Sequence, residues 1–206
     1  MDELLRATAF DELFDHGTKL QKRLSELDGC LPPALCEIDE TSPATKFSAS
    51  TCTIETSLSG IISEWEACDM YKKFIASCES LNDPTTKRLF EDILKDEEEH
   101  LKSFTDIADQ VLLRAFKNTR GPMWIPVGTT HQVLVVLTEA EARVVAWMDS
   151  SKGTFIHYET PQEGTADLVD HLISEMAQPA VIPAEDFSEM TNAAISGSVT
   201  TSCDDV

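Results

Sequence analysis

The sequence predicts an α+β fold, in which a shortened bundle of three long helices is followed by a small α+β module. Two observations predict it. Three long stretches repeat apolar residues at steps of three and four, which places those residues on one face of a helix. These stretches are residues 2–28, 53–81 and 84–116. Beyond residue 120 the apolar residues form short β-branched or alternating runs, which are typical of strands.

The domain boundary is expected near residue 120, where Gly121 and Pro122 follow the last helical stretch. We expect a helical module over residues 1–119 and a small α+β module over residues 120–195. The last residues, 196–206, are rich in Ser, Thr and Asp and are expected to form a disordered tail.

The first helix, residues 2–28, is expected to end with Gly29 as the residue just past its C-terminus. Residues 30–52 then contain Pro32, Pro33, Pro43 and many Ser and Thr residues. This segment is too long for a tight turn and suits a crossover along the outside of a bundle. The next two helices are joined by a turn at residues 82–84, with Pro84 near the first helical position.

The small module is expected to hold three strands, at residues 131–138, 142–149 and 154–159. A helix over residues 165–178 would cover one face of this sheet. Residues 186–195 suit a further short helix.

Composition excludes several classes of protein. The 206 residues carry a formal charge of −21, which argues against nucleic-acid binding because phosphate contacts need a basic surface. The charge suits attraction of cations or a partner with a basic face. No stretch reaches the ~20 apolar residues of a membrane span. The six cysteines form no Cys-x-x-Cys pair, and with an acidic N-terminus they favour reduced thiols in the cytoplasm.

The third helix carries two ionisable residues within its apolar seam. The seam reads Phe90, Ile93, Glu97, His100, Phe104, Ile107 and Val111. A carboxylate buried without a partner is costly, and side chains at i and i+3 project side by side. Glu97 and His100 therefore indicate a metal site. The alternative is that His100 is a core histidine bonded to a neighbouring carboxylate, while Glu98 and Glu99 form a solvated face.

The second helix offers Glu64 within its own apolar stripe, although Trp65 beside it is an alternative buried residue. Two antiparallel helices joined by the turn at residues 82–84 can bring Glu64 opposite Glu97 and His100. This is the layout of half a carboxylate-bridged di-iron site. Carboxylate oxygens with an imidazole suit iron or manganese better than a thiol-preferring ion.

Residues 5–116 resemble a bacterioferritin, a member of the ferritin-like superfamily. The resemblance rests on Glu64, on Asp96-Glu97-Glu98 followed by His100, and on His16 ahead of the crossover. It implies metal ligands for iron at Glu64, Glu97 and His100, with His16 and Glu12 added from the first helix. The associated chemistry is oxidation of Fe(II) by oxygen, so the protein is a candidate enzyme of the ferroxidase type.

The chain departs from that family in four ways. It has no room for the family's first helix, and Leu13 occupies the position of a ligand glutamate, with Glu12 one residue away. Phe14 stands where the family has its haem-binding methionine, so no haem is expected. The module after residue 120 has no counterpart in the family.

Two interpretations of the incomplete ligand set stay open. Either another chain completes the site in a homo-oligomer or hetero-assembly, or the site is degenerate. In the second case the chain is a non-catalytic, bacterioferritin-derived subunit or adaptor, whose acidic surface favours a basic partner and salt-sensitive association.

Overall fold

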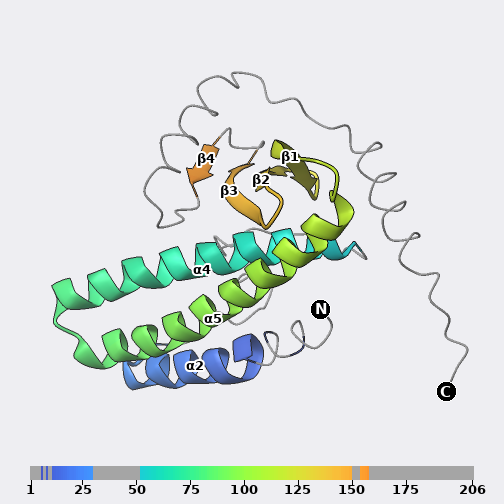
Figure 1. Ribbon diagram of the computed structural model, residues 1–206. Coiled ribbons are helices and arrows are strands. Elements are labelled where there is room, and N and C mark those ends of the chain that lie inside the picture. The colour runs from blue at the N-terminus through green and yellow to red at the C-terminus, as the bar shows by residue number, and fades with distance from the viewer. Residues whose placement is uncertain (1–5, 7, 9–10, 30–51, 150–153, 158–206) are drawn as a thin grey trace, which may run out of the picture. The chain divides into compact units, whose positions relative to one another are not determined.

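The structure is a computed structural model (Figure 1). It describes residues 6, 8, 11–29, 52–149 and 154–157. For residues 11–13 and 154–157 it describes the backbone alone. The helices are a π-helical segment η1 (Asp11–His16), α2 (Gly17–Glu26), α4 (Thr53–Leu81) and α5 (Pro84–Ala115). The strands are β1 (Gly121–Val127), β2 (His131–Leu137), β3 (Ala142–Asp149) and β4 (Thr154–His157). The predicted fold class, a helical region followed by a small module with a sheet, is confirmed.

The chain divides into two compact units that cut across α4 and α5. The first comprises Met1–Lys46 with Gly60–Phe104, and the second comprises Phe47–Ser59 with Thr105–Val206. The boundary near residue 120 stays a prediction. The crossover, the helices over residues 165–178 and 186–195, and the tail lie outside the described residues.

The turn between α4 and α5 has the predicted place and a clear chemical basis. Asn82 takes a φ of 54°, a left-handed conformation that asparagine tolerates. The N–H of Asp83 bonds to the carbonyl of Cys78 at 3.0 Å, which closes the end of α4. Pro84 opens α5, and the Asp83 carboxylate caps that helix by accepting the N–H of Thr86 at 3.0 Å.

The end of α2 differs by one residue from the prediction. Asp28, and not Gly29, takes the left-handed conformation, with a φ of 57°. The N–H of Gly29 bonds to the carbonyl of Leu24 at 2.9 Å. A Cβ on Gly29 would crowd the side chain of Leu24 and lie 3.1 Å from the Leu24 carbonyl oxygen, so a larger residue would require a small local shift.

Arg23 ties α2 to the start of α5 within the first unit. Its Nε donates to Oγ1 of Thr86 at 2.7 Å, and its Nη2 donates to both oxygens of Asp83 at 3.1 and 3.0 Å. The Thr86 hydroxyl also donates to Asp83. This network attaches α2 to the start of α5. His16 is the residue directly before α2.

The apolar seams are buried largely as predicted. On α4 the predicted stripe is buried at all but one position, since Ile75 is only half-buried. On α5 the seam shifts beyond Phe104, because the buried positions are Ala108 and Leu112 instead of the predicted Ile107 and Val111. A helix repeats every 3.6 residues, so its buried face rotates slowly relative to a strict alternation of three and four.

The second unit contains an antiparallel sheet with strand order β1-β2-β3-β4. The three predicted strands are present as β2, β3 and β4. Its core cluster consists of Trp124, Leu134, Val145 and Ala146. Two hydrogen bonds join the sheet to helix ends of the same unit, from the Gly128 N–H to Glu55 at 2.9 Å and from the Ala142 N–H to Asp109 at 2.5 Å.

The first strand, β1, was not predicted, because Pro122 and Pro126 interrupt its pattern. Proline cannot donate to a ladder and is confined to edges of sheets. β1 lies at an edge, and the two prolines are four residues apart, so their missing N–H groups belong to the same side of the strand.

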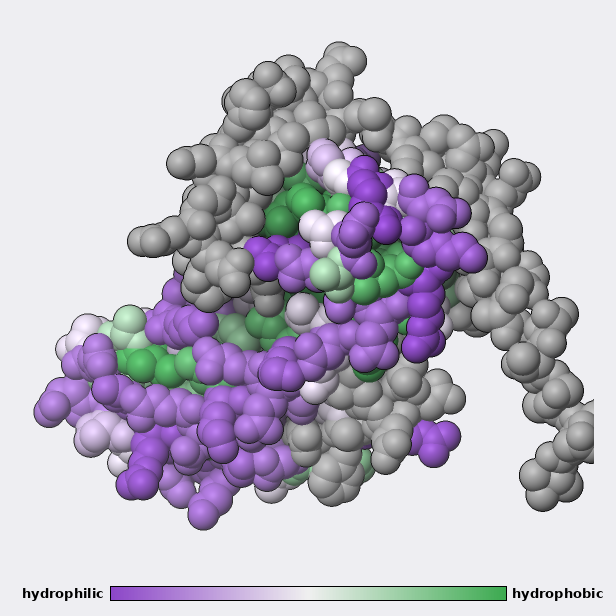
Figure 2. Space-filling view, in the orientation of Figure 1, coloured by the Kyte–Doolittle hydropathy of each residue, from purple (hydrophilic) through white to green (hydrophobic). Residues whose placement is uncertain are grey.

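The surface agrees with the acidic composition. Hydrophilic side chains cover most of the helix faces seen in Figure 2, as expected for a net charge of −21. No helix among the described residues is long and apolar enough to cross a membrane.

Candidate metal centre

Glu64, Glu97 and His100 come together in the first unit, as predicted. They are 6%, 1% and 8% exposed. Nδ1 of His100 lies 3.4 Å from Oε2 of Glu97 and 3.9 Å from Oε2 of Glu64. Trp65 is only half-buried, so Glu64 is the buried member of that pair. Their ligand atoms all lie within 4.8 Å of one another, which is compact enough to surround one cation.

His16 extends this group from the other side. The imidazole is 1% exposed, and its Nδ1 lies 3.4 Å from Oε1 of Glu97. Glu97 therefore directs one oxygen to His16 and the other to His100. The two imidazole centroids are 6.5 Å apart. The buried carboxylate of Glu97 thus lies between two imidazoles, one on either side.

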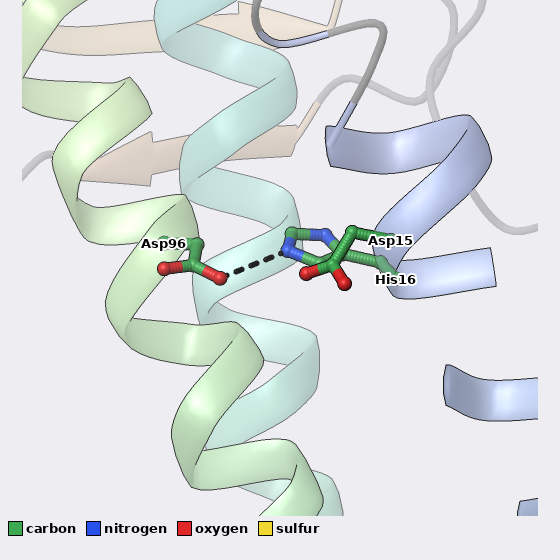
Figure 3. A group of neighbouring side chains, drawn as sticks. All are labelled: Asp15, His16 and Asp96. Carbon is green, nitrogen blue, oxygen red and sulfur yellow. Dashed lines mark hydrogen bonds and ion pairs between the residues drawn. The ribbon is translucent and has the colours of Figure 1, made fainter. Parts of the chain in front are cut away.

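Asp96 contacts His16, which the sequence did not indicate. Its Oδ2 lies 3.2 Å from Nε2 of His16 (Figure 3). A carboxylate that accepts the Nε2–H would hold the imidazole in one tautomer, in which Nδ1 keeps its lone pair and is the nitrogen available to a cation beside Glu97. The order Asp96-Glu97 permits these two contacts, because adjacent residues on a helix point about 100° apart, but it does not indicate that a histidine of another helix lies between them.

Glu98 and Glu99, the residues between Glu97 and His100, face solvent as predicted. The side chains of Glu98 and Glu99 are 55% and 72% exposed and form ion pairs with Lys72 and Lys95. Glu12 and Leu13 lie within η1, but their side chains are outside the described residues, so Glu12 as a ligand stays a prediction.

A buried cysteine on α4 lies outside the group of possible ligand atoms. Cys68 is buried on α4, four residues after Glu64. Burial raises the pKa of the Cys68 thiol to about 12, and the nearby carboxylates of Glu98, Glu97 and Glu64 raise it further while Lys72 opposes them. The thiol is therefore protonated at neutral pH, and the side-chain atoms that cluster with Glu97 are oxygens and nitrogens. Two buried carboxylates with two imidazoles suit a divalent cation such as iron, which would neutralise them.

The arrangement defines a class of protein, a helical bundle with a buried centre of carboxylates and histidines. The model of the ferritin-like domain matches residues 3–113, more than half of the chain, and the chain belongs to this family. The described strands begin at Gly121, after the matched region. No curated protein and no solved structure matches the chain significantly. The finer resemblance to bacterioferritins stays a prediction.

Proposed function

We propose that this protein binds iron through Glu64, Glu97, His100 and His16, with Glu12 as a further ligand, and that it oxidises Fe(II). Fe(II) is the substrate, and each ion gives one electron to oxygen. The family match supports iron handling in general. The compact group of carboxylates and histidines supports the particular residues.

Each side chain has a distinct task in this proposal. Glu97 would be the central carboxylate ligand for iron. His16 and His100 supply a neutral nitrogen on either side of Glu97, and Glu64 supplies a second carboxylate on the side of His100. The burial of these groups keeps water away, which strengthens the attraction between the carboxylates and a cation.

The observation that carries the proposal is the position of Glu97. Its two oxygens each lie 3.4 Å from a ring nitrogen, one of His16 and one of His100. Ligand atoms for a cation must converge from several side chains, and Glu97 is the residue around which these oxygen and nitrogen atoms gather.

Anaerobic titration with Fe(II) tests the proposal. The wild-type chain is expected to bind Fe(II) and, on exposure to oxygen, to form Fe(III). The Glu97→Ala/His100→Ala variant should lose both properties. Glu98→Ala/Glu99→Ala is a matched control, since it removes two acidic residues of the same helix that face solvent. Equal binding by the two variants would remove the proposal.

The ligand set is smaller than the four carboxylates and two histidines of a complete family site. We propose that a second copy of this chain, or another chain, supplies the remaining ligands. Light scattering is expected to give a mass above the 22.8 kDa of one chain. If a monomeric chain binds Fe(II) as tightly as any oligomer, this part of the proposal is contradicted.

A second candidate function is that of a non-catalytic subunit or adaptor. It is favoured by Phe14 and Leu27, two apolar side chains of the first helix that are 63% and 54% exposed. An adaptor would keep its partner, a protein with a basic face, when Glu64 and Glu97 are replaced. Pull-down with wild-type and Glu64→Gln/Glu97→Gln chains at low and high salt separates the two functions.

A further inference from the structure

The helix α2 is held less firmly than the other helices of the first unit. None of its ten residues is buried, and Leu20 and Leu24 are only half-buried. In contrast, α4 and α5 bury side chains completely, such as those of Ile61 and Ile93. A helix of this length is marginal on its own in water, because tertiary contacts supply most of the stability of helices in proteins. The position of α2 therefore depends on a few contacts.

Arg23 supplies the polar contacts that join α2 to the start of α5 (Figure 1). Its Nε donates to Oγ1 of Thr86 at 2.7 Å, and its Nη2 donates to Oδ2 of Asp83 at 3.0 Å. Among the described residues, the other side-chain hydrogen bonds and ion pairs of α2 stay within η1 and α2, as between Lys19 and Asp15. We call Arg23, Asp83 and Thr86 the latch.

The backbone can bend at both ends of α2. The π-helical segment η1 ends at His16, and α2 begins at Gly17. A change of helix type is a common place for a bend, and glycine restricts the backbone least. At the other end, Asp28 takes a left-handed conformation and Gly29 follows it. These ends allow α2 to move as one body when the latch is released.

The start of α2 lies over the candidate metal centre. His16 directly precedes the helix, is 1% exposed, and lies 3.4 Å from Glu97. On the opposite side of its ring is Asp96, whose side chain is 39% exposed. Solvent thus begins directly outside His16, and the imidazole separates it from Glu97. A movement of α2 about Gly17 would shift His16 and open the centre to solvent.

We propose that α2 is a lid over the candidate metal centre and that the latch holds it closed. The lid opens by local release of α2 from α5, while α4 and α5 stay folded. Openings of this kind need less free energy than global unfolding and occur in the elements with the fewest buried contacts. The proposal rests on the proposed function only for the statement that a divalent cation enters when the lid is open.

Hydrogen exchange of the full, metal-free chain, read by mass spectrometry, tests the lid. The variant Arg23→Met removes the latch and should speed exchange of the α2 amides roughly five- to fiftyfold, the range for a partly exposed hydrogen bond to a charged group. The α4 amides of residues 64–78 should keep their wild-type rates. Arg88→Met is the matched control, because Arg88 is an exposed arginine of α5 with no hydrogen bond or ion pair to the described part of the chain. Unchanged exchange of α2 in Arg23→Met, or equal acceleration in α2 and α4, would overturn the proposal.

A measurement on the wild type keeps the test decisive if Arg23→Met does not fold. Local opening exposes little surface, so its rate depends weakly on denaturant. Exchange of the α2 amides should therefore change little between zero and low urea concentrations, whereas exchange of the α4 amides should rise with urea. The same urea dependence in both helices would show that α2 opens only by global unfolding, and the lid would be wrong.

Stopped-flow binding of Co²⁺ under argon separates the lid from the proposed function. Arg23→Met should bind Co²⁺ faster than the wild type, by about the factor measured in hydrogen exchange, and in the same final amount. Equal binding rates together with faster exchange would overturn α2 as the point of entry. If the wild type binds no Co²⁺, the proposed function fails, and hydrogen exchange alone decides whether α2 opens under control of the latch.

Discussion

Glu97 is the buried residue that both histidines of the candidate metal centre contact. It is 1% exposed and lies within 3.4 Å of both His16 and His100. The pattern of the sequence placed Glu97 on a buried seam, and burial of a carboxylate implies a partner. The sequence could not show that both oxygens are used, since that depends on where η1 places His16.

At Cys68, burial leads to a prediction about reactivity. A pKa of about 12 leaves about one thiolate in ten thousand at pH 8. We expect Cys68 to resist iodoacetamide in the native protein, whereas the half-buried Cys52 reacts faster. Peptide mass spectrometry after timed alkylation measures both rates, and alkylation in denaturant is the control. Equal native rates would show that Cys68 is not shielded.

At the level of elements, Asp83 joins the turn, the start of α5 and α2. Hydrogen bonds from Thr86 lower the pKa of Asp83 to about 2, and Arg23 lowers it as well. The carboxylate is ionised in the folded state at a lower pH than the ordinary value of 3.8. Its stabilising effect is therefore complete above that value and is lost as the pH falls through about 2.

The corresponding prediction compares wild type with Asp83→Asn. Asparagine also caps helices well, so the variant loses chiefly the charge that attracts Arg23. Thermal unfolding should show the wild type to be more stable above pH 4, with the difference shrinking between pH 4 and pH 2. A difference that is independent of pH would contradict the role of the charge.

Gly60 marks a close approach between α4 and α5. A Cβ at this position would lie 2.4 Å from Cδ1 of Phe104, which is 2% exposed. Alanine favours helix by about 1 kcal/mol relative to glycine, but forcing a methyl against a buried ring costs about 1–3 kcal/mol. We expect Gly60→Ala to lower the free energy of unfolding. The loss should be smaller in a Phe104→Leu background, and a Gly60→Ala protein as stable as wild type would contradict the close contact.

Other features of the elements show what a sequence can and cannot reveal. The stripes of α4 and α5 were predictable because an apolar period of 3.6 is visible along the chain. β1 was not predictable, because a strand with Pro122 and Pro126 is compatible only with the edge of a sheet, and the sequence does not show which strand lies at the edge. The left-handed residue after α2 was expected to be Gly29, because glycine is the commonest residue in that conformation. The structure places Asp28 there instead, since the short side chain of aspartate is also tolerated.

For the whole molecule, sequence and structure agree on the class and differ in detail. The family match ends at residue 113, and the sheet follows it in the chain. Backbone N–H groups of Gly128 and Ala142 bond to Glu55 and Asp109 of the same unit. The role of Asp96 required a structure, because no periodicity indicates which of two acidic neighbours contacts a histidine from another helix. The formal net charge of −21 follows from composition alone.

The central claim is that iron is held by carboxylate and imidazole groups around Glu97. X-ray absorption at the iron edge, on full-length protein loaded with Fe(II) without oxygen, tests it directly. We predict only oxygen and nitrogen neighbours, a scattering pattern of bound imidazole, and loss of both in Glu97→Ala/His100→Ala. A sulfur neighbour, or a spectrum that is the same in wild type and variant, would contradict the claim.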